Sequence, residues 1–463
     1  MSQSAFASLD LSTALLANLE SLAYYDMTPI QARSLPPALA GIDVIAQAKT
    51  GSGKTAAFAL PLLQKLDVQS FQVQSLVLCP TRELADQVAG ELRRLARGMP
   101  NVKVLTLCGG MPFGPQLGSL EHGAHIVVGT PGRIEEHLRK GSLILKKLGT
   151  FVLDEADRML DMGFQEALDA IVAYLPAPRQ TLLFSATFPA QIQSVAERIL
   201  VDPVMVKVDA SHDSDSIRQY FYQVENDAAR LPALRLLLLR YRPDSTLIFC
   251  NTRRETEAVA TALRAFGFSV LALHGDLEQK DRERILVCFA NKSASILVAT
   301  DVAARGLDID ALDAVINFHL SRDLEVHTHR VGRTGRAGSS GIACSLFTEK
   351  EQFRFAALEK YLQQTLPITP LPEAAVLKQP TFKPPMETLQ IDGGKKQKVR
   401  PGDILGALTG SQEIRAEDVG KIHIFANHAY VAVKRDIAAI AEAKIRHDKL
   451  KGRSFRVRNI RTV

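Results

Sequence analysis

Two short segments contain residue types that bind phosphate and activate water. Residues 48–55 read Ala-Lys-Thr-Gly-Ser-Gly-Lys-Thr, and residues 154–157 read Asp-Glu-Ala-Asp. Closely spaced glycines let backbone N–H groups converge on phosphate oxygens, and a following helix adds its positive N-terminus. In such a loop we expect Lys54 to reach the β- and γ-phosphates and Thr55 to bind Mg²⁺. The other loop residues expected at the nucleotide are Thr50, Gly51, Ser52 and Gly53.

The acidic segment follows an apolar run at residues 151–153 that is typical of a buried strand. Open α/β sheets bind their ligands at the carboxyl ends of the strands. We therefore expect Asp154 to hold Mg²⁺ through water, and Glu155 to orient and deprotonate an attacking water molecule. The alternative is a solvated acidic helix start. The upstream phosphate motif favours the catalytic interpretation, although the strict motif begins with Gly where this chain has Ala48.

Strand and helix patterns alternate through most of the chain, which positions these segments. Apolar, β-rich runs occur at residues 43–46, 75–79, 125–128, 151–153, 181–184, 245–250, 269–273, 295–299, 314–317 and 341–347. Buried parallel strands have this character because helices cover both faces of their sheet. A polar stretch at residues 209–216 interrupts the series. The fold class predicted is α/β, with two parallel-sheet domains joined by a short linker.

The last part of the chain has a different pattern. Prolines cluster around residues 371–385, which predicts an extended linker. Residues 386–463 then read strand, helix, strand, strand, helix, strand, the split β-α-β arrangement of a small α+β domain. Residues 381–463 hold 17 Lys and Arg against 9 Asp and Glu, a net charge of +8, while the rest carries −2. We expect a module that binds a polyanion; a basic surface kept for solubility is the alternative.

Composition excludes several classes of protein. The chain has 463 residues, 46% of them apolar and 23% charged, which excludes collagen and long disordered chains. No uncharged apolar run approaches the ~20 residues of a membrane helix. The first basic residue is Arg33, so no signal peptide is expected. The five cysteines are scattered without a C-x-x-C pair, which argues against disulfides or a zinc site and for a reducing, cytoplasmic location.

The motifs resemble those of the DEAD-box RNA helicases of superfamily 2, in that family's order. The matching blocks lie at residues 46–55, 80–85, 109–110, 130–133, 154–157, 185–187, 247–252, 274–276, 279–282, 298–308 and 329–336. The resemblance implies an ATP-dependent RNA helicase, a hydrolase that uses ATP and Mg²⁺. It also implies two RecA-like domains at residues 1–208 and 217–370, a Pro-rich linker at 371–385 and an RRM-like domain at 386–463.

The resemblance also assigns nucleotide contacts. Thr28-Pro29-Ile30-Gln31 is similar to the family's adenine-reading motif, and the Gln31 amide can donate to and accept from adenine at once. Phe6 is at the position of an upstream aromatic that stacks on the base. Asp308 is expected to bind ribose. Arg333 and Arg336 resemble the arginines that reach the γ-phosphate from the second domain, so the site is expected to be complete only when the domains close.

The RNA surface implied by the same resemblance combines small residues with arginines. Such contacts hold the phosphate backbone without reading sequence, and contacts to 2′-hydroxyls distinguish RNA from DNA. In the first domain the residues are Arg82, Gly110, Thr130 and Arg133, and in the second they are Gly275, Arg282 and Thr300. Residues 185–187 are expected to couple hydrolysis to domain closure. The protein is expected to be monomeric and to separate short duplexes locally.

The final domain resembles the RNA-binding domain of DbpA-type bacterial helicases, and an RRM more generally. Tyr430 fits one aromatic position of the RRM base-stacking strand, while His428 replaces the other; simple packing is the alternative for Tyr430. Basic loop residues expected to bind RNA are Lys395, Lys396, Lys398, Arg400 and Arg453. The resemblance implies targeting to 23S rRNA during assembly of the 50S subunit. Alternatives are a general RNA-remodelling ATPase, a nucleotide-gated RNA clamp and a DNA helicase.

Overall fold

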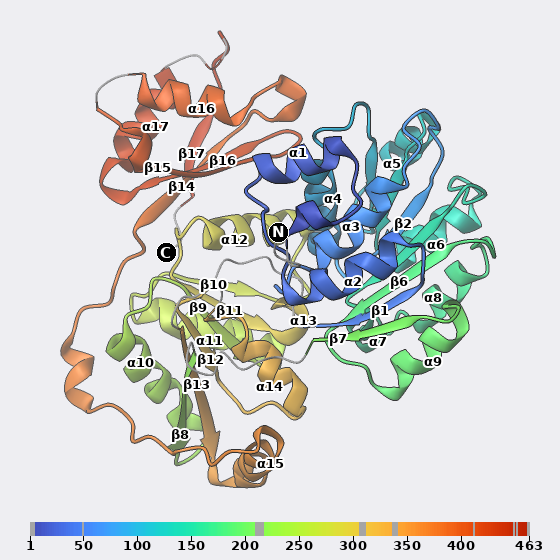
Figure 1. Ribbon diagram of the computed structural model, residues 1–463. Helices are drawn as coiled ribbons and strands as arrows, with labels where there is room; N and C mark the ends of the chain where they lie inside the picture. The colour runs from blue at the N-terminus through green and yellow to red at the C-terminus, as the bar shows by residue number, and fades with distance from the viewer. Residues whose placement is uncertain are drawn as a thin grey trace. The chain divides into compact units, whose positions relative to one another are not determined.

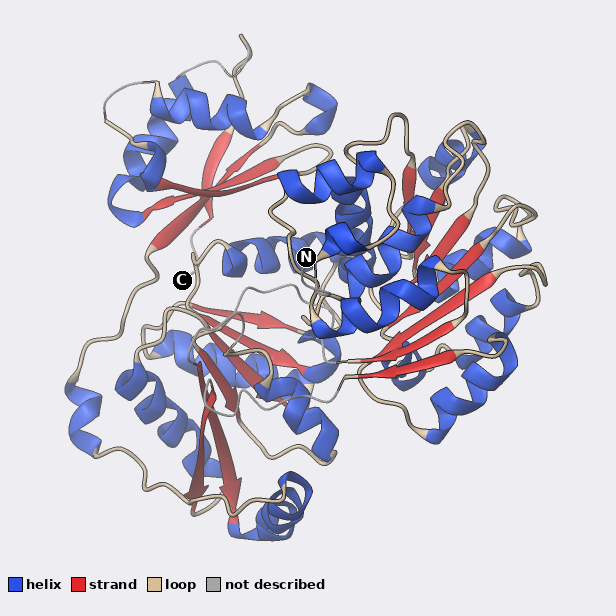
Figure 2. Cartoon of the chain, viewed as in Figure 1, coloured by secondary structure: helices blue, strands red, loops and turns tan. Residues whose placement is uncertain are grey.

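The computed structural model describes residues 5–48, 51–208, 217–304, 312–335, 341–410, 413–447, 450 and 452–460. Within these ranges the chain forms two compact units, one ending at Val208 and one beginning at Ile217 (Figure 1). None of the helices in the described part is both long and apolar enough to cross a membrane. The predicted α/β class is confirmed in both units, and each parallel sheet has helices on its two faces (Figure 2).

The first unit is built on a parallel sheet with the order β3-β4-β2-β5-β6-β1-β7 within residues 44–207. Its strands are β1 (Val44–Gln47), β2 (Ser75–Leu78), β3 (Val104–Leu107), β4 (Ile126–Gly129), β5 (Thr150–Asp154), β6 (Gln180–Ser185) and β7 (Val204–Lys207). The edge strands β3 and β7 were not among the sequence predictions. Both are short: two of the four residues of β3 are half-buried, and three of the four residues of β7 are exposed, so neither strand is fully buried.

Helices of this unit cover both faces of the sheet. They are η1 (Phe6–Ser8), α1 (Thr13–Ser21), α2 (Pro29–Leu39), α3 (Lys54–Gln64), α4 (Arg82–Leu95), α5 (Phe113–Glu121), α6 (Pro131–Arg139), α7 (Ala156–Asp161), α8 (Gln165–Val172) and α9 (Ala190–Ile199). Successive residues of a strand pack into two separate hydrophobic cores. Val152 packs with one core and its neighbours Phe151 and Leu153 with the other, as the period of a strand requires.

The second unit begins with another parallel sheet, ordered β10-β11-β9-β12-β13-β8 within residues 217–348. Its strands are β8 (Ile217–Val224), β9 (Thr246–Cys250), β10 (Val270–Leu273), β11 (Ile296–Thr300), β12 (Ala314–Asn317) and β13 (Gly341–Thr348). The helices are η2 (Asp227–Ala229), α10 (Arg230–Tyr241), α11 (Arg253–Ala265), α12 (Gln279–Ala290), α13 (Asp301–Ala304), α14 (Leu324–Val331), η3 (Glu349–Glu351) and α15 (Gln352–Leu362).

The proline-rich segment is extended, but it packs along the second sheet domain. It contains a short helix, η4 (Ala374–Lys378), whose Val376 and Leu377 join the core around α10. Phe382 meets Phe268 edge-on at 5.5 Å between ring centroids, and the Arg242 guanidinium lies over the Phe382 ring. The segment is therefore anchored to the domain that precedes it.

The small C-terminal domain has the predicted β-α-β-β-α-β order. Its antiparallel sheet runs β15-β16-β14-β17, with β14 (Met386–Ile391), β15 (Val419–Ile424), β16 (Ala429–Lys434) and β17 (Val457–Ile460). Its helices are η5 (Lys395–Gln397), α16 (Pro401–Thr409), η6 (Ala416–Asp418), η7 (Arg435–Ile437) and α17 (Ala438–His447). Leu389, Val431 and Val433 point from one sheet face into a core shared with α16 and α17.

Candidate nucleotide and nucleic-acid sites

The glycine-rich loop leads from β1 into α3, as the phosphate motif requires. Gly51 and Gly53 have φ values of 84° and 90°, a conformation that strongly favours glycine. Lys54, the first residue of α3, is 6% exposed, and its Nζ donates to the carbonyl oxygen of Ala48 at 2.8 Å. The Ala48 position thus contributes through its backbone, and Lys54 is held across the loop.

A hydrogen bond from the Gln31 side chain connects helix α2 to this loop. Gln31 Nε2 donates to the Gly53 carbonyl oxygen at 3.0 Å, and its Oε1 accepts from the Thr28 backbone N–H at 2.8 Å. A Cβ at Gly53 would overlap the Gln31 amide, so glycine is required there for packing as well as for conformation. The predicted adenine-reading residues Thr28 and Gln31 therefore lie directly beside the predicted phosphate loop.

Three buried polar atoms around the loop have no hydrogen-bond partner within the described residues. They are Thr28 Oγ1, Ser52 Oγ and Asp154 Oδ1. Burying an unpaired polar atom is costly, so such atoms fit a site whose partners come from a ligand. Burial raises the pKa of Asp154 to about 7, while the Lys54 ammonium opposes that shift. A carboxylate oxygen, a threonine hydroxyl and phosphate oxygens make up the donor set that Mg²⁺ takes in nucleotide sites.

The three acidic residues at residues 154–157 have different partners. Asp154 keeps one unpaired oxygen, whereas Glu155 forms an ion pair with Arg158 at 2.6 Å. Asp157 Oδ2 accepts hydrogen bonds from the backbone of Ala186 and from both the backbone and hydroxyl of Thr187, at 2.9 to 3.1 Å. Burial alone would raise the pKa of Asp157, but these bonds hold it below its ordinary value. Asp157 thus links the acidic segment to residues 185–187.

Four of the predicted nucleotide residues are either buried within the protein or outside the described residues. Phe6 is 3% exposed and stacks on Tyr24 with 6.2 Å between centroids, so base stacking by Phe6 stays a prediction. Thr50, Asp308 and Arg336 lie outside the described residues.

The predicted RNA residues of the first unit meet at the carboxyl ends of β2, β3 and β4. Gly110 has φ 71°, and a Cβ there would overlap the Arg82 guanidinium, so the two residues lie in contact. Thr130 Oγ1 accepts from the Gly109 N–H at 3.4 Å, and Arg133 donates to the Met111 carbonyl oxygen at 3.0 Å. These four residues therefore lie close together at one edge of the sheet, and their contact with RNA stays a prediction.

The corresponding residues of the second sheet domain also converge. Gly275 follows β10 and is exposed, and Thr300 ends β11, the neighbouring strand. Arg282 of α12 donates to the Ala303 carbonyl oxygen at 2.9 Å, and the Ala303 N–H donates to Thr300 Oγ1. Gly275, Arg282 and Thr300 therefore lie at one edge of the sheet.

Arg333 follows α14 and is 7% exposed. Its neighbour Arg330, which sequence reasoning did not single out, has several side-chain partners. Arg330 forms two 2.7 Å bonds to the Asp301 carboxylate, donates to Asn317 and His319, and lies over the Phe249 ring. Arg330 thus joins α13, which directly follows β11, to α14, the helix that precedes Arg333.

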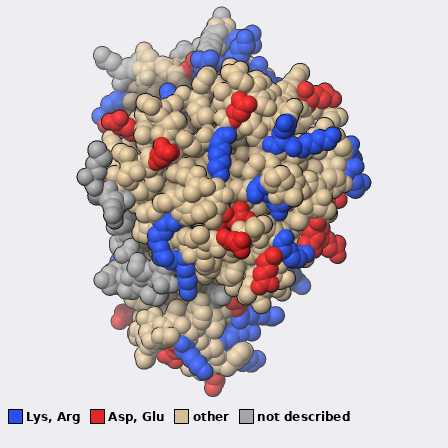
Figure 3. All heavy atoms as spheres, turned by 45° about the vertical axis from the view of Figure 1, so that its right-hand side comes forward, with Lys and Arg blue, Asp and Glu red and all other residues tan. Residues whose placement is uncertain are grey.

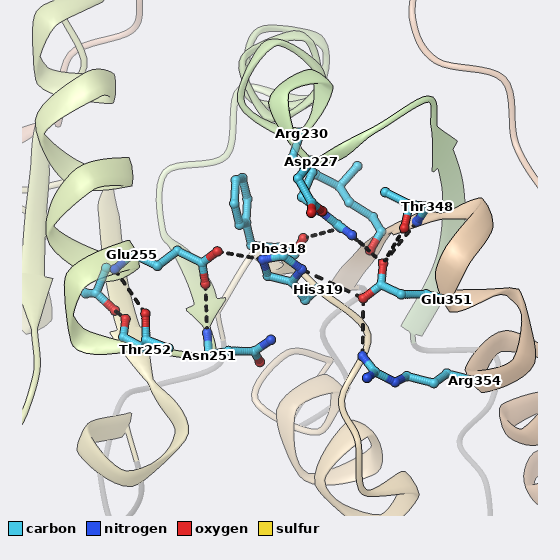
Figure 4. Close-up of polar contacts among 12 residues, drawn as sticks. Asp227, Arg230, Asn251, Thr252, Glu255, Phe318, His319, Thr348, Glu351 and Arg354 are labelled. Atoms are coloured by element: carbon cyan, nitrogen blue, oxygen red, sulfur yellow. Dashed lines mark hydrogen bonds and ion pairs between the residues drawn. The ribbon is translucent and has the colours of Figure 1, made fainter.

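A polar network follows β9, β12 and β13 at the same edge (Figure 4). His319 Nε2 lies 2.6 Å from Glu255 Oε1, and its Nδ1 lies 3.7 Å from Glu351 Oε1. Burial opposes a charge on His319, but the two carboxylates raise its pKa above the ordinary value. Despite burial, bonds from His319, Thr348 and Arg230 lower the pKa of Glu351 to about 2. Arg230 is 1% exposed and also donates to two backbone carbonyls.

The basic loop of the C-terminal domain, residues 395–400, is held against a neighbouring hairpin by backbone hydrogen bonds. Lys395, Lys396, Lys398 and Arg400 are exposed. The backbone N–H groups of Lys395 and Lys396 donate to carbonyls of Phe425 and Ala426, and a Cβ at Gly394 would overlap that hairpin. Arg453 is exposed as well. On the face shown in Figure 3, by contrast, basic and acidic side chains are interspersed.

The outer face of the C-terminal sheet packs on α12 of the preceding domain. His428 Nε2 lies 3.0 Å from Glu283 Oε1, and Thr388 Oγ1 bonds to Asn291 and Ser293 at 3.1 and 2.6 Å. Tyr430 is 1% exposed, and burial, with Glu283 adding to it, raises its pKa to about 12. In this arrangement Tyr430 is a packing residue, the alternative considered from the sequence, and its ring has no face open to a base.

Comparisons with known proteins match this architecture. The DEAD/DEAH box helicase family model covers residues 28–195, the helicase conserved C-terminal domain model covers residues 229–338, and the DbpA RNA binding domain model covers residues 388–459. The ATP-dependent RNA helicase DbpA of Escherichia coli K12 is 53% identical over 98% of this chain and 99% of its own length. The chain belongs to the DEAD-box ATP-dependent RNA helicases.

Other relatives of this DEAD-box helicase match its first two domains. CshA of Geobacillus kaustophilus is 44% identical over 75% of this chain and 74% of its own length. The structure of Saccharomyces cerevisiae Dbp5 bound to RNA and ADP BeF3 has a TM-score of 0.71 at 30% identity, covering 79% of this chain and 96% of that one. The DEAD-box family, the two RecA-like domains and the C-terminal RNA-binding domain are thus confirmed, as is the use of ATP.

Proposed function

We propose that this DEAD-box helicase separates short RNA duplexes locally, with Glu155 as the base, Mg²⁺ at Thr55 and Asp154, and the C-terminal domain directing it to 23S rRNA during 50S assembly. The observation that carries the proposal is that the predicted nucleotide residues and the predicted RNA residues of the first unit lie at the carboxyl edge of one sheet. Lys54 and Asp154 lie there after β1 and β5, and Arg82 and Thr130 lie there after β2 and β4.

Hydrolysis is a displacement at the γ-phosphorus. The water oxygen attacks, its proton passes to the Glu155 carboxylate, and the bond from the γ-phosphorus to the bridging oxygen breaks, which releases ADP and phosphate. Lys54 holds the β- and γ-phosphates. Mg²⁺ would neutralise charge on the same phosphates. Arg333 and Arg336, from the second sheet domain, would stabilise the transition state when RNA bridges both domains.

The two groups of RNA residues suit this role because their geometry holds the backbone. Glycines at residues 110 and 275 allow close approach of phosphates, and Arg82, Arg133 and Arg282 provide charge. Duplex separation then follows from holding one strand in a shape that its partner strand does not fit. The role of Asp157 is to transmit the state of the nucleotide site to residues 185–187 through its three accepted hydrogen bonds.

The proposed rRNA targeting rests on two supports. One is the match to the DbpA RNA binding domain model and the similarity to a relative of that name. The other is the exposed cationic loop at residues 395–400, which leaves a basic surface even though the sheet face is covered. A tether of this kind raises the concentration of the helicase core near duplexes in the same RNA. The protein would act as a monomer in the cytoplasm.

The test uses RNA-stimulated phosphate release and binding to a 23S rRNA fragment. Glu155→Gln should lower the rate of release about 10²- to 10⁴-fold while ATP and RNA still bind. The double variant Lys395→Gln/Lys396→Gln should weaken fragment binding and reduce its salt dependence by about two counterions. The matched control removes two exposed lysines of the preceding domain, Lys350→Gln/Lys360→Gln, and should bind normally. Unchanged binding by the loop variant contradicts the tether, and full activity of Glu155→Gln contradicts the catalytic assignment.

A further inference from the structure

Glu155 and Arg158 form a buried ion pair within one helical turn. Arg158 Nη1 donates to Glu155 Oε2 at 2.6 Å, and each side chain is 5% exposed. Among the ion pairs of the first unit that the structure describes, the other pairs have at least one partner with 23% or more of its side chain exposed. A pair with both charges removed from water loses much of its attraction to desolvation, so it is a weak source of stability.

The backbone at Glu155 is strained as well. Its φ and ψ are 53° and 51°, the left-handed region that a residue with a long side chain seldom adopts. The strained residue directly follows Asp154, which keeps one buried carboxylate oxygen without a hydrogen-bond partner in the described residues, and directly precedes α7. Strain of this kind persists where the surrounding structure fixes one conformation, and it is concentrated at functional sites.

We infer that Arg158 is a positioning residue for ATP hydrolysis, acting through Glu155. Its guanidinium holds one carboxylate oxygen and so fixes the direction in which the carboxylate meets the attacking water. The inference rests on the proposed role of Glu155 as the base. Arg158 lies in α7, and Glu155 directly precedes this helix. The pair is therefore internal to the first unit and needs no residue of the second sheet domain.

Arg158 is also fixed through its backbone. Its N–H donates to Asp157 Oδ1 at 3.0 Å, and the other oxygen of the same carboxylate accepts a hydrogen bond from the Thr187 N–H. Arg158 therefore connects the proposed base to the segment that responds to the nucleotide. A planar guanidinium keeps its orientation better than an ammonium, which can turn about its stem. A lysine should accordingly preserve the charge but only part of the alignment.

The test is a double-mutant cycle on RNA-stimulated ATP hydrolysis by the full chain. Arg158→Gln should lower kcat about tenfold, a part of the 10²- to 10⁴-fold effect of a base, with KM for ATP within about twofold of wild type. Arg158→Lys should lie between Arg158→Gln and wild type. In a Glu155→Gln background neither substitution should lower kcat further, because the group through which Arg158 acts is gone.

Thermal unfolding shows whether each variant is folded. If Arg158→Gln does not fold, the same comparison is made with Arg158→Lys, whose smaller loss must also vanish when residue 155 is Gln. The control is Arg198→Gln, which breaks an exposed ion pair to Asp169 in the same unit and should leave kcat unchanged. An equal loss in both backgrounds, or normal kcat in folded Arg158→Gln, overturns the inference. If Glu155→Gln itself stays fully active, the proposed base is wrong, which is a separate result.

Discussion

The Gln31 amide donates to the Gly53 carbonyl oxygen, which joins helix α2 to the predicted phosphate loop across 22 residues of sequence. A single side chain therefore links the two segments that are predicted to contact the base and the phosphates. Loss of this amide removes a contact to the loop as well as the proposed contacts to the base.

Gln31→Ala should raise KM for ATP about tenfold and reduce the preference for ATP over GTP, since each amide contact to a base contributes ~1–3 kcal/mol of discrimination. Steady-state ATPase assays with both nucleotides at saturating RNA measure this. Gln193→Ala removes an exposed helical glutamine of the same unit and serves as the control. An unchanged ATP-to-GTP ratio would show that Gln31 has only a structural role.

Mg²⁺ binding should depend on pH through Asp154. Burial raises the pKa of Asp154 to about 7, so the carboxyl gains its charge only as the pH rises through that value. The half-saturating Mg²⁺ concentration for binding of a fluorescent ATP analogue should therefore be higher at pH 6 than at pH 8, by up to about tenfold. Asp154→Asn should remove most of this difference. The same Mg²⁺ dependence at both pH values in the wild type would contradict the assignment.

The network around His319 should make the stability of the second unit depend on pH. His319 has a raised pKa, so its stabilising charge is fully present below its unfolded value of about 6.5 and is lost as the pH rises through the folded value. Glu351 has a lowered pKa, so its contribution is present above about 4.5 and is lost as the pH falls toward 2. His319→Gln should flatten the decline in Tm between pH 6 and pH 9.

Glu351→Gln tests the same network from the acidic side. Arg230 is 1% exposed, and removing one partner of a buried ion pair typically costs about 3–5 kcal/mol. Denaturant unfolding should show a loss of this size at pH 7. Glu349→Gln, two residues away, is the matched control because its side chain is exposed. Equal stability of the two variants would contradict the proposed importance of the buried pair.

Sequence patterns predicted the two parallel sheets, the acidic motif and the small α+β domain because each depends on local apolar runs or on close spacing. The edge strands β3, β7 and β8 were missed. Thr106 interrupts the apolar residues of β3, the apolar run of β7 is only three residues long, and Arg218, Gln219 and Gln223 interrupt β8. The covering of Tyr430 by α12 depends on two segments more than 140 residues apart, and no pattern in either one indicates it. Arg158 could have been found from its i+3 spacing to Glu155.

Docking of the C-terminal sheet on α12 should depend on Thr388. Thr388→Val would remove the hydrogen bonds that Asn291 and Ser293 make with the Thr388 hydroxyl, at a cost of about 1–3 kcal/mol. Hydrogen exchange should then become faster in β14 and in the C-terminal half of α12. Thr409→Val, which loses a bond inside α16, should leave exchange in α12 unchanged. Protection of α12 that is equal in all three proteins would contradict the packing described here.

ATP hydrolysis should require RNA bound to both helicase domains, because the catalytic site is complete only when the two domains close on it. Phosphate release at saturating ATP, measured with and without a single-stranded RNA, tests this directly. We expect RNA to raise the rate at least about tenfold, and Arg333→Gln to remove that stimulation while ATP still binds. A rate that is the same without RNA, or stimulation that survives Arg333→Gln, would contradict the account.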